Sequence, residues 1–379
     1  MIIQSKRVYL SSTFSPAQIE IVDGVIKQIY SYNTKKVDKD YGELRIVPGF
    51  YDIHTHGYHG FDTMAGGKEG LRKWLKYLPS EGVCGVFPTT MAQGHDTIKK
   101  AVTEICEVKK EEPEGAEILG IHLEGPYLNV RYKGAQPEEY IVKGTIEEFK
   151  EYQDACGNLI KIIALAPEND EDFRLTKYCA ENGVCVSIGH TDTDYDTALM
   201  AIANGAKGFT HTFNAMTAFG HRENGAVGAA FRFHDTYAEC ICDGNHSTFA
   251  ALNIFFREKQ GYGIMITDSL MCKGFEPGTH CDFCGQEIEI YPDGSAHIAS
   301  GRKQLAGSTL KVNDGLRILV EKALVPFETA IDACTINPMR YLNMDDHKGR
   351  IKAGFDADIV VLENDYCVHQ TYCKGVEQI

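Results

Sequence analysis

Short runs of apolar residues alternate with longer amphipathic stretches through most of the chain. Eight apolar runs predict strands near residues 47–53, 82–88, 118–123, 159–165, 184–188, 208–210, 237–242 and 263–267. Stretches with apolar residues at helical spacing lie between them, as at 68–80, 96–110, 170–182 and 249–260. Strands that alternate with helices are typical of a parallel sheet. Eight such units predict an α/β fold of the TIM-type (β/α)8 barrel class.

Both ends of the chain depart from this pattern, because their apolar runs are not separated by helices. Several runs lie between residues 2 and 30, with a dipeptide that favours a tight hairpin turn at Asp23-Gly24. Further runs lie between residues 359 and 372. The predicted division is a small β-sandwich domain from both chain ends, residues 1–47 and 349–379, and a barrel domain of residues 48–348.

Composition limits the classes of function and the compartment. The formal net charge of −15 over 379 residues argues against binding to nucleic acid, which requires basic surface to neutralise phosphates. The 13 cysteines are scattered without the spacing of a secreted disulfide scaffold, and the first residues form no apolar signal-peptide core. No apolar run approaches the ~18 residues that span a bilayer. A cytoplasmic protein without a membrane partner is therefore expected.

Histidines and acidic residues stand where several predicted strands end, and in a TIM-type barrel these ends surround the active site. His54 and His56 are two residues apart on one strand, so their side chains project from the same face. Glu124, His190 and His211 end three later strands. Imidazoles with a carboxylate and no cysteine are typical of an open catalytic site for zinc, iron or a similar divalent ion. The sequence therefore predicts a metal site with one or two ions, which Glu124 could bridge.

Such a site acidifies a water molecule and polarises a carbonyl, so the sequence predicts a metal-dependent hydrolase. Asp268 ends the eighth predicted strand, where it could take a proton from the water and pass it to a leaving amine. The alternative for Asp268 is a turn or helix-capping aspartate, and the alternative for Glu124 is a buried salt-bridge partner. His122 shares the strand face of Glu124, and we interpret it as a packing residue.

The segments Pro48-Gly49-Phe50-Tyr51-Asp52-Ile53-His54-Thr55-His56-Gly57 and His122-Leu123-Glu124-Gly125-Pro126-Tyr127 resemble the amidohydrolase superfamily and, within it, the N-acetylglucosamine-6-phosphate deacetylases. The resemblance continues through Gly189-His190-Thr191, His211-x-Phe213-Asn214-Ala215-Met216, Arg222-Glu223, Asp243-Gly244-x-His246, Thr267-Asp268 and Leu305-Ala306-Gly307-Ser308. It thus covers nearly the whole chain. It implies hydrolysis of N-acetyl-D-glucosamine 6-phosphate to D-glucosamine 6-phosphate and acetate, a step of amino-sugar catabolism.

The same resemblance implies roles for further residues. Asp268 would be the general base and acid, and the retained His54 and His56 favour two ions. The implied substrate-binding residues are Ala135, Gln136, Asn214, Ala215, Arg222, Asp243, His246, Leu305, Ala306 and Gly307. Among them, His246 and Arg222 would contact the phosphate, with Arg222 reaching across from a second subunit of a homodimer.

Three residues depart from the family pattern. Gln136 stands where a histidine is common, Asn224 replaces a proline and Ser269 replaces an alanine. A glutamine can form hydrogen bonds but carries no charge, so Gln136 could shift the substrate preference. One alternative function is another amide or cyclic-amide hydrolase of the superfamily, although the fourth strand ends at Pro167-Glu168 without the lysine of the cyclic-amide enzymes. The other alternative is a noncatalytic barrel that binds a sugar phosphate.

Overall fold

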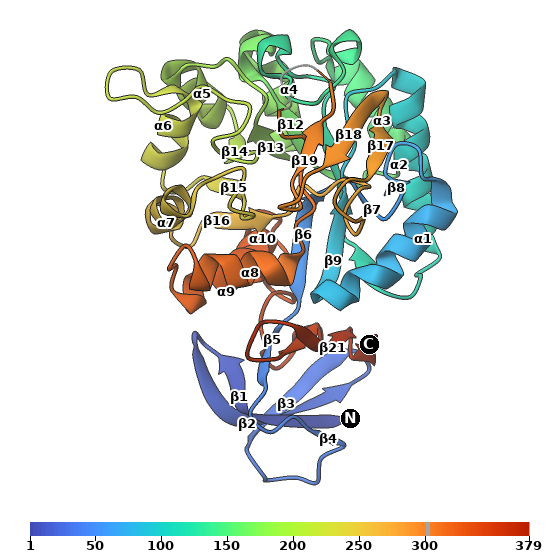
Figure 1. The fold of residues 1–379 in the computed structure, drawn as a ribbon, viewed down its shortest axis with the longest axis vertical. Coiled ribbons are helices and arrows are strands. Elements are labelled where there is room, and N and C mark those ends of the chain that lie inside the picture. The colour runs from blue at the N-terminus through green and yellow to red at the C-terminus, as the bar shows by residue number, and fades with distance from the viewer. Residues whose placement is uncertain (301–303, 379) are drawn as a thin grey trace.

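A computed structural model describes residues 1–300 and 304–378 of the protein. The chain forms a small sheet at one end of the molecule and a larger part of parallel strands and helices at the other (Figure 1). Between the two parts, β5 (Arg45–Pro48) pairs in the small sheet, and β6 (Phe50–Thr55) begins after Gly49 in the larger part. The predicted strand at 47–53 is therefore divided between the two parts.

The larger part is built on two parallel sheets. One has the order β10-β9-β6, and the other has the order β11-β12-β13-β14-β15-β16. The strands other than β6 are β9 (Val83–Pro88), β10 (Glu117–Ile118), β11 (Ile121–Glu124), β12 (Ile160–Leu165), β13 (Cys185–Ile188), β14 (Ala206–Phe209), β15 (Tyr237–Ile241) and β16 (Gly263–Ile266). Each lies within a few residues of a predicted strand.

Hydrogen bonds join the two parallel sheets at both of their edges. At one edge, the backbone N–H of Thr90, after β9, donates to the carbonyl of His122 in β11 at 3.0 Å. At the other, the N–H of Asp268, after β16, donates to the carbonyl of His54 in β6 at 2.9 Å. The carboxyl ends of strands from both sheets therefore come together around one region.

Helices flank the parallel sheets (Figure 1). They are α1 (Gly67–Tyr77), α2 (His95–Lys110), α3 (Ile146–Ala155), α4 (Arg174–Glu181), α5 (Tyr195–Ala203), α6 (Gly225–Arg232), α7 (Phe249–Glu258), α8 (Val312–Glu321), α9 (Phe327–Cys334) and α10 (Ile336–Tyr341), with 3-10 turns at Leu78–Glu81, Val130–Tyr132, Glu138–Tyr140, Pro167–Asn169 and Glu171–Phe173. Helix α2 illustrates why they form: Ile98, Val102 and Ile105 recur at helical spacing and are buried against the sheet. Its last turn ends in two lysines, which suit the negative end of the helix dipole.

The small sheet contains strands from both ends of the chain. They are β1 (Ile2–Leu10), β2 (Thr13–Val22), β3 (Val25–Ser31), β4 (Lys39–Asp40), β5, β20 (Ile359–Leu362), β21 (Val368–Cys373) and β22 (Val376–Glu377). Strand β20 lies between β21 and β5, and Val360 pairs with Val47 in antiparallel register. Ile19, Ile46 and Val361 are fully buried in the core of this sheet. The two chain ends thus depend on each other for backbone pairing and for burial.

Two smaller sheets lie near the carboxyl ends of the parallel strands. One consists of β7 (Gly57–Tyr58) and β8 (Phe61–Asp62), and the other of β17 (His280–Phe283), β18 (Gln286–Ile290) and β19 (Ala296–Ile298). The second sheet is held to a loop after β11, because the side-chain amide of Gln286 donates to the carbonyl of Ala135. It therefore covers one side of the region where the strands converge (Figure 1).

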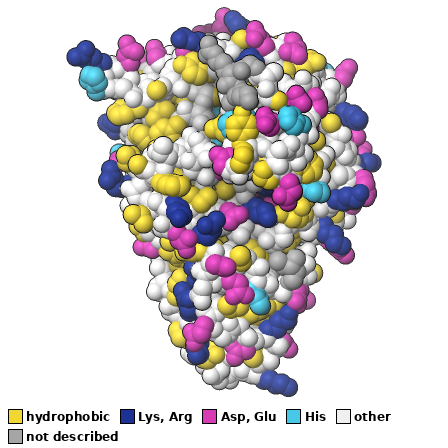
Figure 2. Space-filling model, viewed as in Figure 1, with side chains coloured by type: hydrophobic (Ala, Val, Ile, Leu, Met, Phe, Trp, Pro, Cys, Tyr) yellow, Lys and Arg dark blue, Asp and Glu magenta, His cyan; other side chains and the backbone are white. Residues whose placement is uncertain are grey.

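The visible surface carries charges of both signs. On the face drawn in Figure 2, Lys and Arg side chains are interspersed with Asp and Glu side chains. No helix among the described residues is both long and apolar enough to cross a membrane.

Candidate active site

The fold brings together the five residues predicted as metal ligands and the predicted acid and base. His54 lies in β6 and Glu124 ends β11, whereas the other four follow strand ends within two residues. The carboxyl ends of parallel strands meet at one edge, so residues far apart in the sequence become neighbours. The side chains are buried, with exposed fractions of 9% or less: His54, His56, Glu124, His190, His211 and Asp268.

Glu124 lies at the centre of this cluster. Its Oε1 atom is 3.1 Å from Nε2 of His211, 3.2 Å from Nε2 of His190 and 3.3 Å from Nε2 of His54. Its Oε2 atom is 3.3 Å from Nε2 of His56. The carboxylate therefore stands between one pair of imidazoles from β13 and β14 and a second pair from β6.

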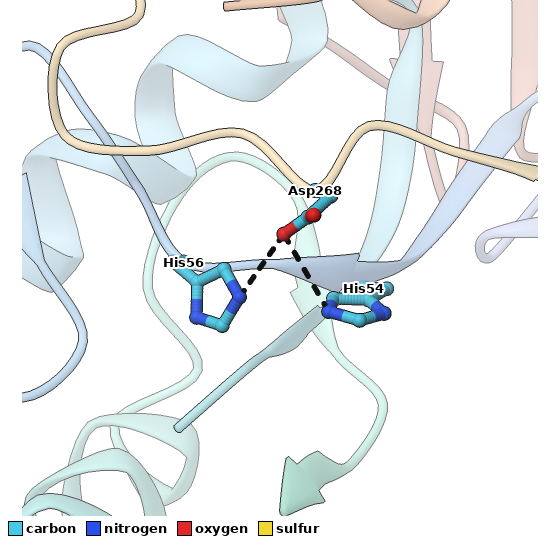
Figure 3. A group of neighbouring side chains, drawn as sticks. All are labelled: His54, His56 and Asp268. Carbon is cyan, nitrogen blue, oxygen red and sulfur yellow. Dashed lines mark ion pairs between the residues drawn. The ribbon is translucent and has the colours of Figure 1, made fainter. Parts of the chain in front are cut away.

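Asp268 completes the group on the side of β6. Its Oδ1 atom is 3.1 Å from Nε2 of His56 and 3.6 Å from Nε2 of His54, and all three side chains point toward one another (Figure 3). Two neighbouring sets of donor atoms result: His54, His56 and Asp268 in the first, and Glu124, His190 and His211 in the second. All of these residues except His54 line one cavity.

Each of the four imidazoles also has a partner for its outer nitrogen. Three Nδ1 atoms face backbone carbonyls: His56 that of Thr89 at 3.1 Å, His190 that of Tyr132 at 2.8 Å, and His211 that of Asn214 at 3.2 Å. Nδ1 of His54 instead faces the carboxylate of Glu239 at 2.9 Å. A carbonyl or carboxylate oxygen only accepts, so Nδ1 must carry the proton. All four Nε2 atoms therefore turn toward the cavity and are available as metal ligands.

The donor set fits a divalent cation. Nε2 of His54 is buried and has no hydrogen-bond partner within the described part of the chain, and Nε2 of His190 and His211 face each other at 3.1 Å. Such a convergence of acceptor nitrogens and carboxylates is stable only around positive charge. Ligands bound tetrahedrally to zinc at about 2.0–2.1 Å are roughly 3.3 Å apart, which agrees with the separations of 3.1–3.6 Å across the cluster.

The electrostatics of the cluster are dominated by its carboxylates. Burial lowers the pKa of His56, but hydrogen bonds and charges of Asp268 and Glu124 outweigh burial and raise it to about 9. Burial raises the pKa of Glu124, yet the charge of His54 and the hydrogen bonds of its imidazole neighbours bring it well below the usual value. A cation bound here would compete with protons on the imidazoles, so its affinity would fall at low pH.

Three of these residues have an unusual backbone conformation. The φ angles of His190, His211 and Asp268 are 46°, 29° and 48°, in the left-handed region that non-glycine residues rarely adopt. Each such residue costs about 1–3 kcal/mol, and the conformation persists only where surrounding structure imposes it. Such residues also occur elsewhere in the chain, as at Ser12 and Leu324, but three of the six cluster residues adopt this conformation.

The cluster opens into a cavity of about 370 Å³. Seven of the predicted substrate-binding residues line it: Ala135, Gln136, Asn214, Ala215, His246, Leu305 and Gly307. Asp243 acts on the cavity through His246, whose Nδ1 lies 2.7 Å from its carboxylate. Ala306 is buried in the packing beside it, and Arg222 is exposed on a loop outside the cavity of its own chain. The predicted role of Arg222 in a second subunit remains a prediction.

Gln136 contacts the central carboxylate directly. Its Oε1 accepts the backbone N–H of Ala92 at 2.8 Å, which turns Nε2 toward Glu124, where it donates to Oε2 at 2.8 Å. The residue that departs from the family pattern is therefore a buried hydrogen-bond donor to the proposed bridging ligand. Its effect on substrate preference would act through Glu124 as well as through the cavity.

Several residues at the site were not identified from the sequence. Arg131, Tyr132 and Phe283 line the cavity from the loop after β11 and from β17. Glu239 lies beneath His54 in the middle of β15 and is 1% exposed. A glutamate within the apolar run Tyr237 to Ile241 was a signal that could have identified it, because an unpaired charge is rarely buried in a strand.

The chain matches the Amidohydrolase family over residues 45–377. It therefore belongs to the amidohydrolase family, which agrees with the strand-end histidines and the central carboxylate described above.

Individual relatives define the subgroup more closely. The chain is 38% identical over 334 residues to the N-acetylglucosamine-6-phosphate deacetylase of Bacillus subtilis (strain 168), covering 87% of this chain and 83% of the relative. It is 32% identical over 358 residues to the N-acetylgalactosamine-6-phosphate deacetylase of Escherichia coli O157:H7, covering 94% of this chain and 93% of the relative. The fold also matches a solved structure from Mycobacterium smegmatis, a mutant N-acetyl-D-glucosamine-6-phosphate deacetylase in complex with N-acetyl-D-glucosamine-6-phosphate. The TM-score is 0.94 at 25% identity, and the match covers 100% of this chain and 99% of the other.

Proposed function

We propose that the protein hydrolyses the acetamide bond of N-acetyl-D-glucosamine 6-phosphate to give D-glucosamine 6-phosphate and acetate. The observation that carries this proposal is the convergence of four imidazoles, Glu124 and Asp268 at the base of one cavity. Relatives named as deacetylases of this substrate support it. In the same proposal, residues 48–348 form a closed (β/α)8 barrel domain, and both chain ends form the small domain.

Five residues would hold the metal: His54, His56, Glu124, His190 and His211. One or two divalent ions, zinc, iron or similar, would supply Lewis-acid activation of a water molecule and of the amide carbonyl when bound. The chain itself fixes the tautomer of each imidazole and keeps Glu124 ionised, so that the donor atoms are already oriented before the substrate arrives.

Asp268 would move the proton. Burial raises its pKa, and the hydrogen bond and charges of His56 and His54 bring it below the usual value, so the carboxylate is ionised at neutral pH. It can therefore accept a proton from the attacking water. It then gives that proton to the nitrogen of the sugar as the carbon–nitrogen bond breaks, so that the amine leaves in its neutral form.

His246 would recognise the phosphate. His246 lines the cavity, and burial lowers its pKa, whereas the hydrogen bond and charge of Asp243 raise it by more than burial lowers it. An imidazolium there would pair with an anionic phosphate. The partner subunit's Arg222 would add a second cation, so the expected active form is a homodimer. The expected compartment is the cytoplasm.

Acetate release from phosphorylated and unphosphorylated N-acetyl-D-glucosamine tests this function. We expect turnover of the phosphorylated sugar, loss of turnover after chelation and recovery with a divalent ion. Equal kcat/KM for the two sugars would remove the phosphate role of His246. Hydrolysis of dihydropyrimidine rings in place of the sugar would establish the cyclic-amide alternative, and tight sugar-phosphate binding without turnover would establish a noncatalytic barrel.

N-acetyl-D-galactosamine 6-phosphate is a second candidate substrate, because a relative of 32% identity is named as its deacetylase. The two sugars differ only in the orientation of one hydroxyl group. A site that hydrogen-bonds this hydroxyl rejects the wrong epimer strongly, because the mismatch leaves buried polar groups unpaired. The ratio of kcat/KM for the two epimers decides between the candidates.

A further inference from the structure

One histidine of the cluster is held differently from the other three. His56, His190 and His211 donate their Nδ1 protons to neutral backbone carbonyls. His54 instead donates to the ionisable side chain of Glu239, with Nδ1 and Oε2 separated by 2.9 Å. The two residues are 185 positions apart in the sequence, and both side chains are completely or almost completely buried.

Glu239 is poorly compensated by the protein itself. Among the described residues, its Oε1 atom has no hydrogen-bond partner, and Oε2 accepts only from His54 and, at 3.4 Å, from the backbone N–H of His211. Among residues 1–300 and 304–378, no lysine or arginine forms an ion pair with it. A buried carboxylate without a cation is strongly unfavourable, so a compensating positive charge is expected nearby.

The charge of the whole cluster indicates where that compensation comes from. Three carboxylates, those of Glu124, Glu239 and Asp268, contact the same imidazole ring of His54 within 3.6 Å. A single divalent ion would leave one of these negative charges uncompensated in a buried site. Two divalent ions would offset all three and leave positive charge where an anionic transition state develops.

We propose that Glu239 is a positioning residue that fixes the Nδ1–H tautomer of His54 and supplies the charge that allows a second divalent ion to bind beside His54 and His56. The inference rests on the metal-dependent function proposed above. It assigns the first ion to Glu124, His190 and His211. Their side chains have other partners, and Glu239 reaches this set through the backbone N–H of His211 at 3.4 Å.

A different use of Glu239 would be as a ligand itself, since donor atoms of His54, His122 and Glu239 lie within 4.8 Å of one another. The hydrogen bonds argue against an ion at that place. Nδ1 of His54 is directed to Glu239, and Nδ1 of His122 is directed to the carbonyl of Ile53 at 3.1 Å. The ring of His122 packs edge-on against that of His54, with 4.4 Å between the centroids, and so fills the space.

Two substitutions separate the charge of Glu239 from its hydrogen bond. Glu239→Gln keeps the shape and can still accept the Nδ1 proton, but it removes the charge. Glu239→Leu removes both. Asp52→Asn is the matched control, because Asp52 is a 1% exposed carboxylate on the strand of His54. Its side chain accepts from Thr267 and, at 3.4 Å, from the backbone N–H of His54, and among the described residues its hydrogen bonds involve no imidazole.

Metal content is measured on the full-length protein by elemental analysis after equilibration with zinc, and affinities by competition with a chromogenic chelator. We expect two ions per chain in the wild type and in Asp52→Asn. The second ion should bind about 10-fold more weakly in Glu239→Gln and about 100-fold more weakly in Glu239→Leu, with the affinity of the first ion unchanged. Nitrogen chemical shifts of the metal-free protein should show the Nδ1–H tautomer of His54 in Glu239→Gln and a mixture of tautomers in Glu239→Leu.

Two ions bound at wild-type affinity in either Glu239 variant would overturn the proposal, and so would a wild-type protein that binds one ion or more than two. If Glu239→Leu does not fold, the Glu239→Gln comparison still decides the outcome. Failure of the proposed function has a different signature, because the wild type would then release no acetate whatever its metal content.

Discussion

Replacement of Asp268 by asparagine tests the proposed proton transfer most directly. The substitution preserves the size of a side chain that is 9% exposed and leaves one oxygen able to face His56, from which Oδ1 of Asp268 is 3.1 Å distant. The amide cannot accept a proton from water at neutral pH. General acid–base catalysis contributes about 10²- to 10⁴-fold to a rate, so the barrier should rise by about 3–5 kcal/mol.

The position of Asp268 predicts which kinetic constant changes. It lies among the imidazoles, where we place the reacting bond, whereas His246 lines the cavity where we place the phosphate. We therefore expect kcat for acetate release to fall by the full factor, with a change in KM of only a few fold, because the lost interaction is made in the transition state. Coupled detection of acetate gives both constants.

Metal content and thermal unfolding must be measured on the same Asp268→Asn preparation, since Asp268 belongs to one of the two donor sets. A fall in kcat that follows loss of an ion would indicate a ligand role. The proposed proton transfer is refuted if the variant keeps its metal and deacetylates at a rate within a few fold of the wild type.

Three further predictions concern other parts of the site and the fold. In the wild type, kcat/KM for the phosphorylated sugar should decline as pH rises through the elevated pKa of His246, because the neutral imidazole no longer attracts phosphate. Asp243→Asn removes the charge that raises this pKa, so the pH–rate profile of the variant should show the decline at lower pH. Gln136→Leu leaves the backbone N–H of Ala92 unpaired, so urea unfolding should show a loss of about 1–3 kcal/mol, and an unchanged midpoint would contradict this. Lys348→Met leaves the buried carboxylate of Asp358 and the partly exposed carboxylate of Asp356 without their cation. The free energy of unfolding should fall by about 3 kcal/mol in the same assay, whereas a stabilised variant would show that desolvation dominates.

Local features of the sequence were sufficient to predict the residues that the fold brings together in the cluster. His54 and His56 share a face because side chains alternate along any strand, and the strand itself follows from the apolar run that precedes them. The alternation of apolar runs and amphipathic stretches likewise located the strands and helices within a few residues. These properties depend on neighbouring residues alone, so they can be read without knowledge of the fold.

The tertiary structure decided which distant residues act on the ligands. Glu239 lies in an apolar strand, and its contact with His54 exists only because β15 and β6 both point side chains into the same interior. Gln136 reaches Glu124 because the loop after β11 folds back over the strand ends. Such contacts depend on how strands are ordered and how loops return, which many residues determine together through burial and backbone pairing. No local pattern in the sequence predicts these contacts.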